Sequence, residues 1–169
     1  SVLFTDLSSY STITENMSPE IALEFLNEYF TKMHEVIREF EGHILNYIGD
    51  SIMVVFGAPQ KLNNHENKAV ECSLKMKNQL KELNTQWDNN KLSRYWKNHG
   101  IDSINMRIGI HTGNVIAGNL GSREMLQYST IGDTVNVAAR LEQANKDFNT
   151  DSTVSPITDG FFAIVIPAA

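Results

Sequence analysis

Two aspartates stand where apolar strands end or turn, and their carboxylates could bind a metal ion. Asp6 ends the stretch VLFTD, and Asp50 follows a glycine at the turn of NYIGDSIMVVFG. If the two strands pair in one sheet, the carboxylates come together and repel each other, so the pair calls for a compensating cation. Mg²⁺ prefers such oxygen ligands and is commonly held by one or two carboxylates together with substrate phosphates. Aspartate is also a favoured turn residue, so a purely structural role for Asp50 stays open.

A second polar pair lies in the segment TIGDTVNVAARLE. Asn136 and Arg140 are four residues apart, so both lie on one face of the helix predicted there. An amide and a guanidinium side by side could orient a sugar and neutralise the charge of a reacting phosphate. Arg140 could equally pair with Glu142 or another surface carboxylate, and the spacing leaves both interpretations open.

Two long amphipathic helices are predicted from apolar periodicity. The first begins with Ser18 as N-cap and Pro19 at the first helical position, and Gly42 follows as a stop. Its predicted core stripe is Ala22, Leu26, Phe30, Met33, Ile37 and Phe40. The second helix runs from His65 to about Trp87, with predicted core positions Val70, Leu74, Met76, Leu80 and Leu83.

The strands are predicted from short runs rich in apolar residues. Residues 1–7 form one strand, and residues 43–57 form two strands around a tight turn that places Asp50 at the tip. Residues 104–122 are predicted as two strands brought close together by a turn at 112–114.

The remaining segments complete the order of elements. Residues 88–100 are polar and aperiodic and are predicted to be a surface loop, whereas residues 123–146 pass from a strand into a third helix near Asp133. The result is a βαββαβ order with an extra helix and strands. It predicts the α+β class, with a ferredoxin-like core in which an antiparallel or mixed sheet is flanked by helices.

Composition limits the class of protein. With 169 residues, 41% hydrophobic and 20% charged, the chain suits one globular domain over residues 1–169, and we expect it to be truncated at both ends. The net charge of −6 argues against a nucleic-acid partner. The single cysteine, Cys72, allows no intramolecular disulfide, and no apolar run approaches the ~20 residues of a membrane span. We therefore expect a domain without direct membrane contact, in the cytoplasm or on the cytoplasmic side of a membrane-anchored parent.

Four segments, taken together and in this order, resemble the class III nucleotidyl cyclases, the family of adenylyl and guanylyl cyclase catalytic domains. They are VLFTDLSSYS, NYIGDSIMVVFG, RIGIHTGNVIAGNLGS and YSTIGDTVNVAARLE, and they span about residues 2 to 155. The sequence is most similar to the bacterial adenylyl cyclases of the threonine/serine subgroup. The resemblance implies that the ribose 3′-oxygen of a nucleoside triphosphate attacks the α-phosphorus and releases pyrophosphate, with two Mg²⁺ or Mn²⁺ ions per site.

The resemblance also implies roles for individual residues. Asp6, Asp50 and the backbone carbonyl of Leu7 match the metal ligands of the family. Asn136 matches the asparagine that positions the ribose, and Arg140 matches the arginine that stabilises the transition state. In this family one catalytic domain supplies the metal aspartates of a site, and the other domain supplies its base, ribose and arginine positions. We therefore expect a head-to-tail homodimer with two sites, inactive as a monomer and covalently linked to an upstream regulatory domain.

Base selection is expected at Asn46 and Ser129. Adenylyl cyclases of the family usually carry lysine at the first position and aspartate or threonine at the second, and guanylyl cyclases typically carry glutamate at the first. The Asn46 amide can donate to adenine N1 and accept from the exocyclic amine, and Ser129 can also accept from that amine. The sequence favours ATP as the substrate, with GTP as the alternative.

Other interpretations stay open beside an active cyclase. A catalytically silent cyclase-homology module that only dimerises is kept open by Asn46 and by the C-terminal stretch PITDGFFAIVIPAA, which lacks the triphosphate-contacting lysine of the family. A diguanylate cyclase or palm-type polymerase would share the sheet and the metal chemistry, but the sequence has no GGDEF-like turn. His111 is expected to be a packed or hydrogen-bonded histidine and not a general base.

Overall fold

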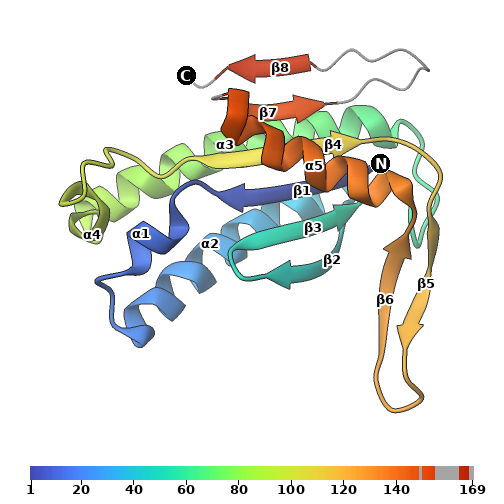
Figure 1. Ribbon diagram of the computed structural model, residues 1–169, viewed down its shortest axis with the longest axis horizontal. Helices are drawn as coiled ribbons and strands as arrows, with labels where there is room; N and C mark the ends of the chain where they lie inside the picture. Colours follow the sequence, from blue (N-terminus) through green and yellow to red (C-terminus); the bar gives the residue numbers. More distant parts are fainter. Residues whose placement is uncertain (149, 155–163, 168–169) are drawn as a thin grey trace.

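The computed structural model describes residues 1–148, 150–154 and 164–167 of the chain (Figure 1). Its elements follow in the order β1 (Val2–Leu7), α1 (Tyr10–Thr14), α2 (Pro19–Glu39), β2 (His43–Ile48), β3 (Ser51–Val55), α3 (His65–Asn89), α4 (Arg94–Lys97), β4 (Met106–His111), β5 (Ile116–Gly121), β6 (Leu126–Ile131), α5 (Asp133–Phe148), β7 (Thr150–Val154) and β8 (Ile164–Pro167). Among these described residues, no helix is long and apolar enough to cross a membrane.

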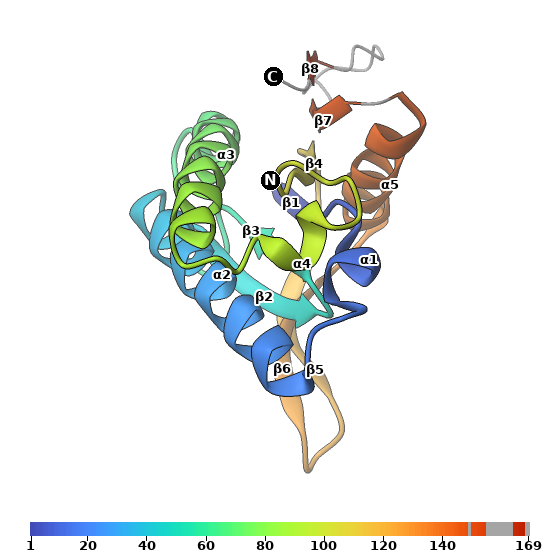
Figure 2. The same cartoon turned by 90° about the vertical axis from the view of Figure 1, so that its left-hand side faces the viewer.

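The main sheet has the strand order β2-β3-β1-β4-β7-β8. Strand β1 lies between β3 and β4 and is antiparallel to both, while β4 and β7 run parallel. Helices α2 and α3 cover one face of the sheet, and α5 lies on the other face (Figure 2). This arrangement confirms the predicted α+β class with a ferredoxin-like βαββαβ core.

Helix α2 begins and ends where the sequence predicts, but it buries a partly different face. The Ser18 hydroxyl oxygen caps the helix by accepting a hydrogen bond from the Ile21 amide (3.4 Å). Gly42 follows the helix at a place where a side chain would collide with Ile37 and Phe56. The buried residues of α2 are Phe25, Tyr29, Met33, Val36 and Ile37.

The predicted core stripes are therefore wrong in part. Ala22, Leu26, Phe30 and Phe40 are only partly buried, because α2 packs against α3 as well as the sheet and its buried face is turned accordingly. In α3, Leu74 is 42% exposed. The buried face of that helix includes three small residues that the predicted stripe left out: Ala69, Cys72 and Ser73.

The predicted surface loop at 88–100 is also wrong. It contains helix α4, and Trp96 on that helix is fully buried. The Trp96 ring packs edge-on against Trp87, with ring centroids 5.7 Å apart, and lies 6.0 Å from the ring of Phe25. Trp96, together with the partly buried Leu92 and Tyr95, attaches the polar segment to the core, although the segment shows no periodic pattern.

Strands β5 and β6 do not belong to the main sheet, which corrects the expectation that residues 104–122 fold as two adjacent strands. Strand β5 pairs with β6 in a separate two-stranded sheet, from Ile116 opposite Ile131 to Gly121 opposite Leu126. We call residues 116–131 the β5–β6 arm, which extends away from the sheet (Figure 1). Five large apolar side chains of the arm are more than half exposed: Ile116, Leu120, Met125, Leu126 and Ile131.

A glycine fixes how closely α5 lies on the sheet, and this contact gives a first prediction. A side chain at Gly109 of β4 would collide with the backbone of Ala138 and Glu142 in α5. Because backbone cannot rotate away as a side chain can, we expect Gly109→Ala to lower the free energy of unfolding by about 1–3 kcal/mol in urea denaturation. The matched control is Gly118→Ala in the β5–β6 arm, where an added side-chain carbon meets nothing within 4 Å. Equal losses of stability in the two variants would contradict this account.

Candidate functional site

The two aspartates singled out from the sequence lie together at one end of the central strands. Strand β1 pairs with β3 through Thr5 opposite Ile52, so the residues that follow Thr5 and precede Ile52 are neighbours. The Ser51 hydroxyl donates to Asp6 Oδ1 (2.7 Å), and the Leu7 amide donates to Asp50 Oδ2 (2.9 Å). The fold therefore brings Asp6, Leu7 and Asp50 to one place.

Burial and the neighbouring Asp6 make a negative charge on Asp50 unfavourable. The pKa of the Asp50 carboxyl is raised to about 7, mainly by burial and further by a hydrogen bond with Asp6 and by its charge. The hydrogen bond from the Leu7 amide opposes this rise. Two carboxylates and a backbone carbonyl are hard oxygen donors, and this donor set fits Mg²⁺ or Mn²⁺.

The donor set is also incomplete on its own. Among the described residues, no group of three or more His, Cys, Asp or Glu side chains could hold a metal ion. A cation held by Asp6, Asp50 and the carbonyl of Leu7 would therefore take further ligands from substrate or water. Asp6, Asp50 and the carbonyl of Leu7 would hold such an ion, and it would supply positive charge to a phosphorylated substrate.

Sequence reasoning missed Arg107 beside the pair, and it considered Glu142 only as a possible partner of Arg140, whereas the structure pairs Glu142 with Arg107. Arg107 on β4 lies directly opposite Asp6 on β1. Its guanidinium donates to Asp6 Oδ2, and its Nε donates to Glu142 Oε1 (2.9 Å). Burial raises the pKa of the Glu142 carboxyl, and the hydrogen bond from Arg107 partly opposes this. Only the register between β1 and β4 places Arg107 opposite Asp6, and the sequence alone does not give that register.

Asn136 and Arg140 do not join the aspartates within one chain. Both are exposed on α5, whereas Ala138 and Glu142 on the same helix are buried. Residues two positions apart on an α-helix differ by about 200° in direction, so the exposed pair points away from the buried side. The first turn of α5 is fixed by the Thr134 hydroxyl, which donates to the carbonyl of Asn114 (2.9 Å).

The predicted base-binding residues lie on neighbouring elements of one chain. Asn46 is exposed on β2, and Ser129 is half-buried on β6. The Gln127 side-chain amide donates to the carbonyl of Leu45 (2.9 Å), which attaches the β5–β6 arm to β2. Gln127 is another residue that sequence reasoning missed, because its partner is 82 positions away.

His111 is half-buried at the end of β4, in agreement with a packed histidine. Its Nδ1 atom is buried and has no hydrogen-bond partner among the described residues. Burial is the main reason that the pKa of His111 is lowered.

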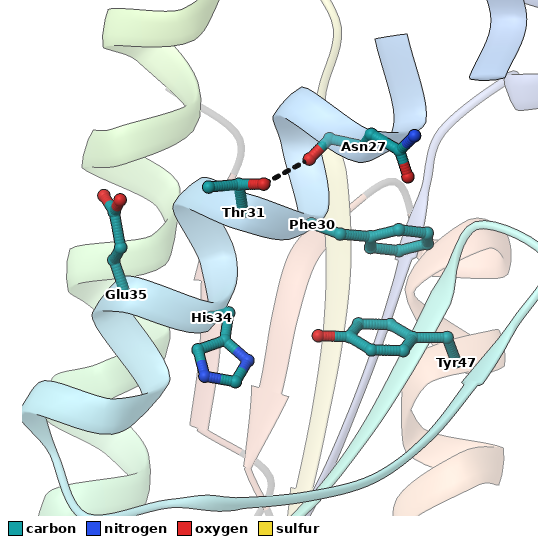
Figure 3. A pocket seen from close by; sticks show the side chains of 6 residues that line it. All are labelled: Asn27, Phe30, Thr31, His34, Glu35 and Tyr47. Carbon is teal, nitrogen blue, oxygen red and sulfur yellow. Dashed lines mark hydrogen bonds between the residues drawn. The ribbon is translucent and has the colours of Figure 1, made fainter. Parts of the chain in front are cut away.

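A separate hollow lies between α2 and β2 (Figure 3). Its volume is about 410 Å³, and its lining is Asn27, Phe30, Thr31, His34, Glu35 and Tyr47. The rings of Phe30 and Tyr47 pack at an angle of 46°, with centroids 4.4 Å apart. This hollow is distinct from the candidate site, because its lining includes neither aspartate of the pair, neither Asn136 nor Arg140, and neither predicted base-binding residue.

The raised pKa of Asp50 predicts how stability depends on pH without metal. The folded-state pKa lies above the ordinary value of 3.8, so the folded chain binds the proton more tightly and loses stability as the pH rises from about 4 through 7. Asp50→Asn removes this loss. In EDTA, we expect its gain in melting temperature over the wild type to be larger at pH 8 than at pH 5. The expected difference is about 2–4 °C, which ~1 kcal/mol produces in a domain of this size, allowing for solvent screening.

The control for this measurement is Asp102→Asn, at an exposed position outside the site. It should shift the melting temperature equally at both pH values. An equal shift for Asp50→Asn would show that Asp50 carries no unfavourable charge at neutral pH.

Comparison with known proteins identifies the family of this chain. The sequence profile described as adenylate and guanylate cyclase catalytic domain matches residues 1–155. "Adenylate cyclase 1" of Rhizobium meliloti is 37% identical over 153 residues, which cover 90% of this chain and 22% of the relative. "Adenylate cyclase" of Anabaena cylindrica is 33% identical over 147 residues, which cover 87% of this chain and 27% of the relative. The chain thus spans less than a third of the length of either relative.

A solved structure shows the same fold. The crystal structure of the guanylyl cyclase Cya2 superposes with a TM-score of 0.74 at 30% sequence identity, covering 97% of this chain and 87% of that one. The aspartate pair, the strand order around it and these similarities lead to one conclusion. The chain belongs to the family of adenylate and guanylate cyclase catalytic domains.

Proposed function

We propose that the chain is an adenylyl cyclase domain that converts ATP to 3′,5′-cyclic AMP and pyrophosphate. The observation that carries the proposal is the pair of carboxylates, Asp6 and Asp50, held together at one end of the central strands. Both sequence relatives described above are adenylate cyclases, which supports ATP. The likeness to a guanylyl cyclase structure and the neutral Asn46 keep GTP as the second candidate substrate.

Two Mg²⁺ or Mn²⁺ ions, when bound, would activate the ribose 3′-hydroxyl and neutralise charge on the triphosphate. Asp6, Asp50 and the carbonyl of Leu7 would hold them. Asn136 would orient the ribose through its amide, and Arg140 would stabilise the charge that develops on the α-phosphate. The 3′-hydroxyl gives its proton to water as its oxygen bonds to the α-phosphorus, the bond from the α-phosphorus to the bridging oxygen breaks, and pyrophosphate leaves with that oxygen.

Base recognition would depend on the contact between β2 and the β5–β6 arm. Gln127 holds the arm against Leu45, next to Asn46. The Tyr128 ring packs edge-on against His43, with centroids 5.5 Å apart, and so supports the strand that carries Ser129. We infer that Asn46 and Ser129 read the adenine edge from the same chain.

The proposed active form is a head-to-tail homodimer. Asn136 and Arg140 point away from the aspartates of their own chain, so they are available to the aspartates of a second copy. The exposed apolar side chains of the β5–β6 arm form a surface of the kind that a second subunit covers. A two-fold arrangement uses both features twice and creates two equal sites.

The domain would be one part of a larger regulated protein. Its relatives are about four times as long as the region they share with this chain. We propose that a covalently linked regulatory domain controls the assembly of the two sites, and that the catalytic domain works in the cytoplasm.

The substrate assignment is tested by mass spectrometry of the products formed from ATP and from GTP in the presence of MnCl₂. We expect cyclic AMP from ATP as the faster reaction. Asp50→Ala should lower its rate more than about a hundredfold, because one ligand of the activating cations is lost. Asp102→Ala is the matched control and should keep the wild-type rate. Faster turnover of GTP would reverse the substrate assignment, and no cyclic nucleotide from either substrate would favour a silent module.

Mixing two inactive variants tests the shared site. Asp50→Ala and Arg140→Ala chains each form homodimers in which every site is defective. In an equimolar mixture, half of the dimers are mixed and contain one intact site, so we expect about one quarter of the wild-type rate. Rates are measured before and after the chains exchange. A mixture that stays inactive after exchange would show that each site is built within one chain.

A further inference from the structure

Arg107 connects the aspartate pair to the inner face of α5. Its guanidinium donates to Asp6 Oδ2, and its Nε donates to Glu142 Oε1 (2.9 Å). The three side chains have little access to water, with exposed fractions of 20% for Arg107, 22% for Asp6 and 12% for Glu142. Ion pairs with so little solvent around them are screened weakly.

The guanidinium occupies an oxygen that a metal ion would need. Asp6 Oδ1 already accepts from Ser51, and Asp50 Oδ2 already accepts from the Leu7 amide. With Arg107 on Asp6 Oδ2, both oxygens of the Asp6 carboxylate accept hydrogen bonds from the protein. A divalent cation that approaches Asp6 meets the positive charge of Arg107, and the two cations repel each other.

Glu142 supplies the alternative partner for that positive charge. Its carboxylate is buried on the side of α5 that faces the sheet, where an unpaired charge would be costly. The helix lies close to β4 because Gly109 has no side chain, and an added one would collide with the backbone of α5. Glu142 is thus a fixed anion beside a guanidinium that can exchange Asp6 for other partners.

We propose that Arg107 is a resident counter-cation of Asp6, and that Glu142 is a positioning residue that controls how readily Arg107 gives Asp6 up to a divalent cation. When the cation binds Asp6, Arg107 stays on Glu142 and its charge remains neutralised. Without Glu142, Asp6 is the remaining described partner of the guanidinium and is held more tightly. The inference rests on the proposed function in so far as the aspartate pair binds metal.

The test measures Mn²⁺ binding without turnover. MnCl₂ is titrated into the wild-type chain and its variants at pH 8 without nucleotide, and free Mn²⁺ is followed by electron paramagnetic resonance. Glu142→Gln should weaken Mn²⁺ binding about five- to tenfold, and Arg107→Gln should strengthen it by a similar factor. The matched controls are Glu71→Gln and Arg38→Gln, at exposed positions on α3 and α2, and both should bind Mn²⁺ as the wild type does.

The double variant separates this mechanism from a simple loss of negative charge. If Glu142 acts through Arg107, the Glu142→Gln change should have little effect on Mn²⁺ affinity in the Arg107→Gln background. If Glu142 merely attracts the cation, the same change should weaken binding equally in both backgrounds, and the proposal is wrong. Weaker binding by Arg107→Gln would also overturn it.

Two further measurements separate the Mn²⁺ affinity from loss of folding and from loss of catalysis. Thermal unfolding shows whether each variant is folded, and if Glu142→Gln is not, the sign of the Arg107→Gln effect decides. If the wild type produces cyclic AMP but the two variants change the Mn²⁺ affinity in the opposite directions, only this inference is wrong. If the variants change the Mn²⁺ affinity as expected but the wild type produces no cyclic nucleotide, only the proposed function is wrong. If the wild type shows no Mn²⁺ binding that Asp50→Asn removes, this inference is wrong, and the product assay with nucleotide decides the proposed function separately.

Discussion

Repulsion between two half-buried carboxylates is the constraint around which the centre of this fold is organised. Asp6 and Asp50 come together because β1 is flanked by β3, and the strand pairing that creates the core also creates the repulsion. The chain reduces the cost with an amide at one aspartate and a hydroxyl at the other. It then adds a guanidinium from the strand on the opposite side of β1. Each neighbour of the central strand thus contributes to the same electrostatic problem.

Helix α5 serves this centre with one side and the solvent with the other. Its inner side places Glu142 beside Arg107, and the tight approach at Gly109 keeps that side in register with β4. Its outer side presents Asn136 and Arg140. A helix that is polar on both sides cannot be held by hydrophobic packing alone, which explains the buried Asn145. Its side-chain amide donates to the carbonyl of Ile108 in β4 (3.0 Å) and so attaches the helix to the sheet.

Much of the fold and part of the site could be predicted from the sequence, for identifiable reasons. Ser18, Pro19 and Gly42 bound a helix through local chemistry, and Asp6 and Asp50 stand next to apolar strands whose pairing follows from the order of elements. These signals come from residues that are close together in the sequence, so they can be recognised without the structure.

What could not be predicted depends on contacts between distant residues. Arg107 opposes Asp6 only through the register of β1 and β4, and Glu142 reaches Arg107 only because α5 crosses the sheet. Trp96 becomes a core residue within a polar segment because Trp87 and Phe25 leave a place for it. The roles of Asn136, Arg140, Asn46 and Ser129 stay predictions, since the structure of a single chain shows their positions but not their contacts with substrate.

The β5–β6 arm has a consequence for how the protein responds to its own abundance. A two-stranded ribbon is marginally stable alone, and contacts of Gln127 and Tyr128 with β2 help to attach this one to the rest of its chain. If a second copy covers its apolar face, the number of complete sites grows with the square of the chain concentration while dimers are scarce. Turnover per chain would then rise as the protein accumulates, and any device that raises the local concentration of two copies would act as a switch.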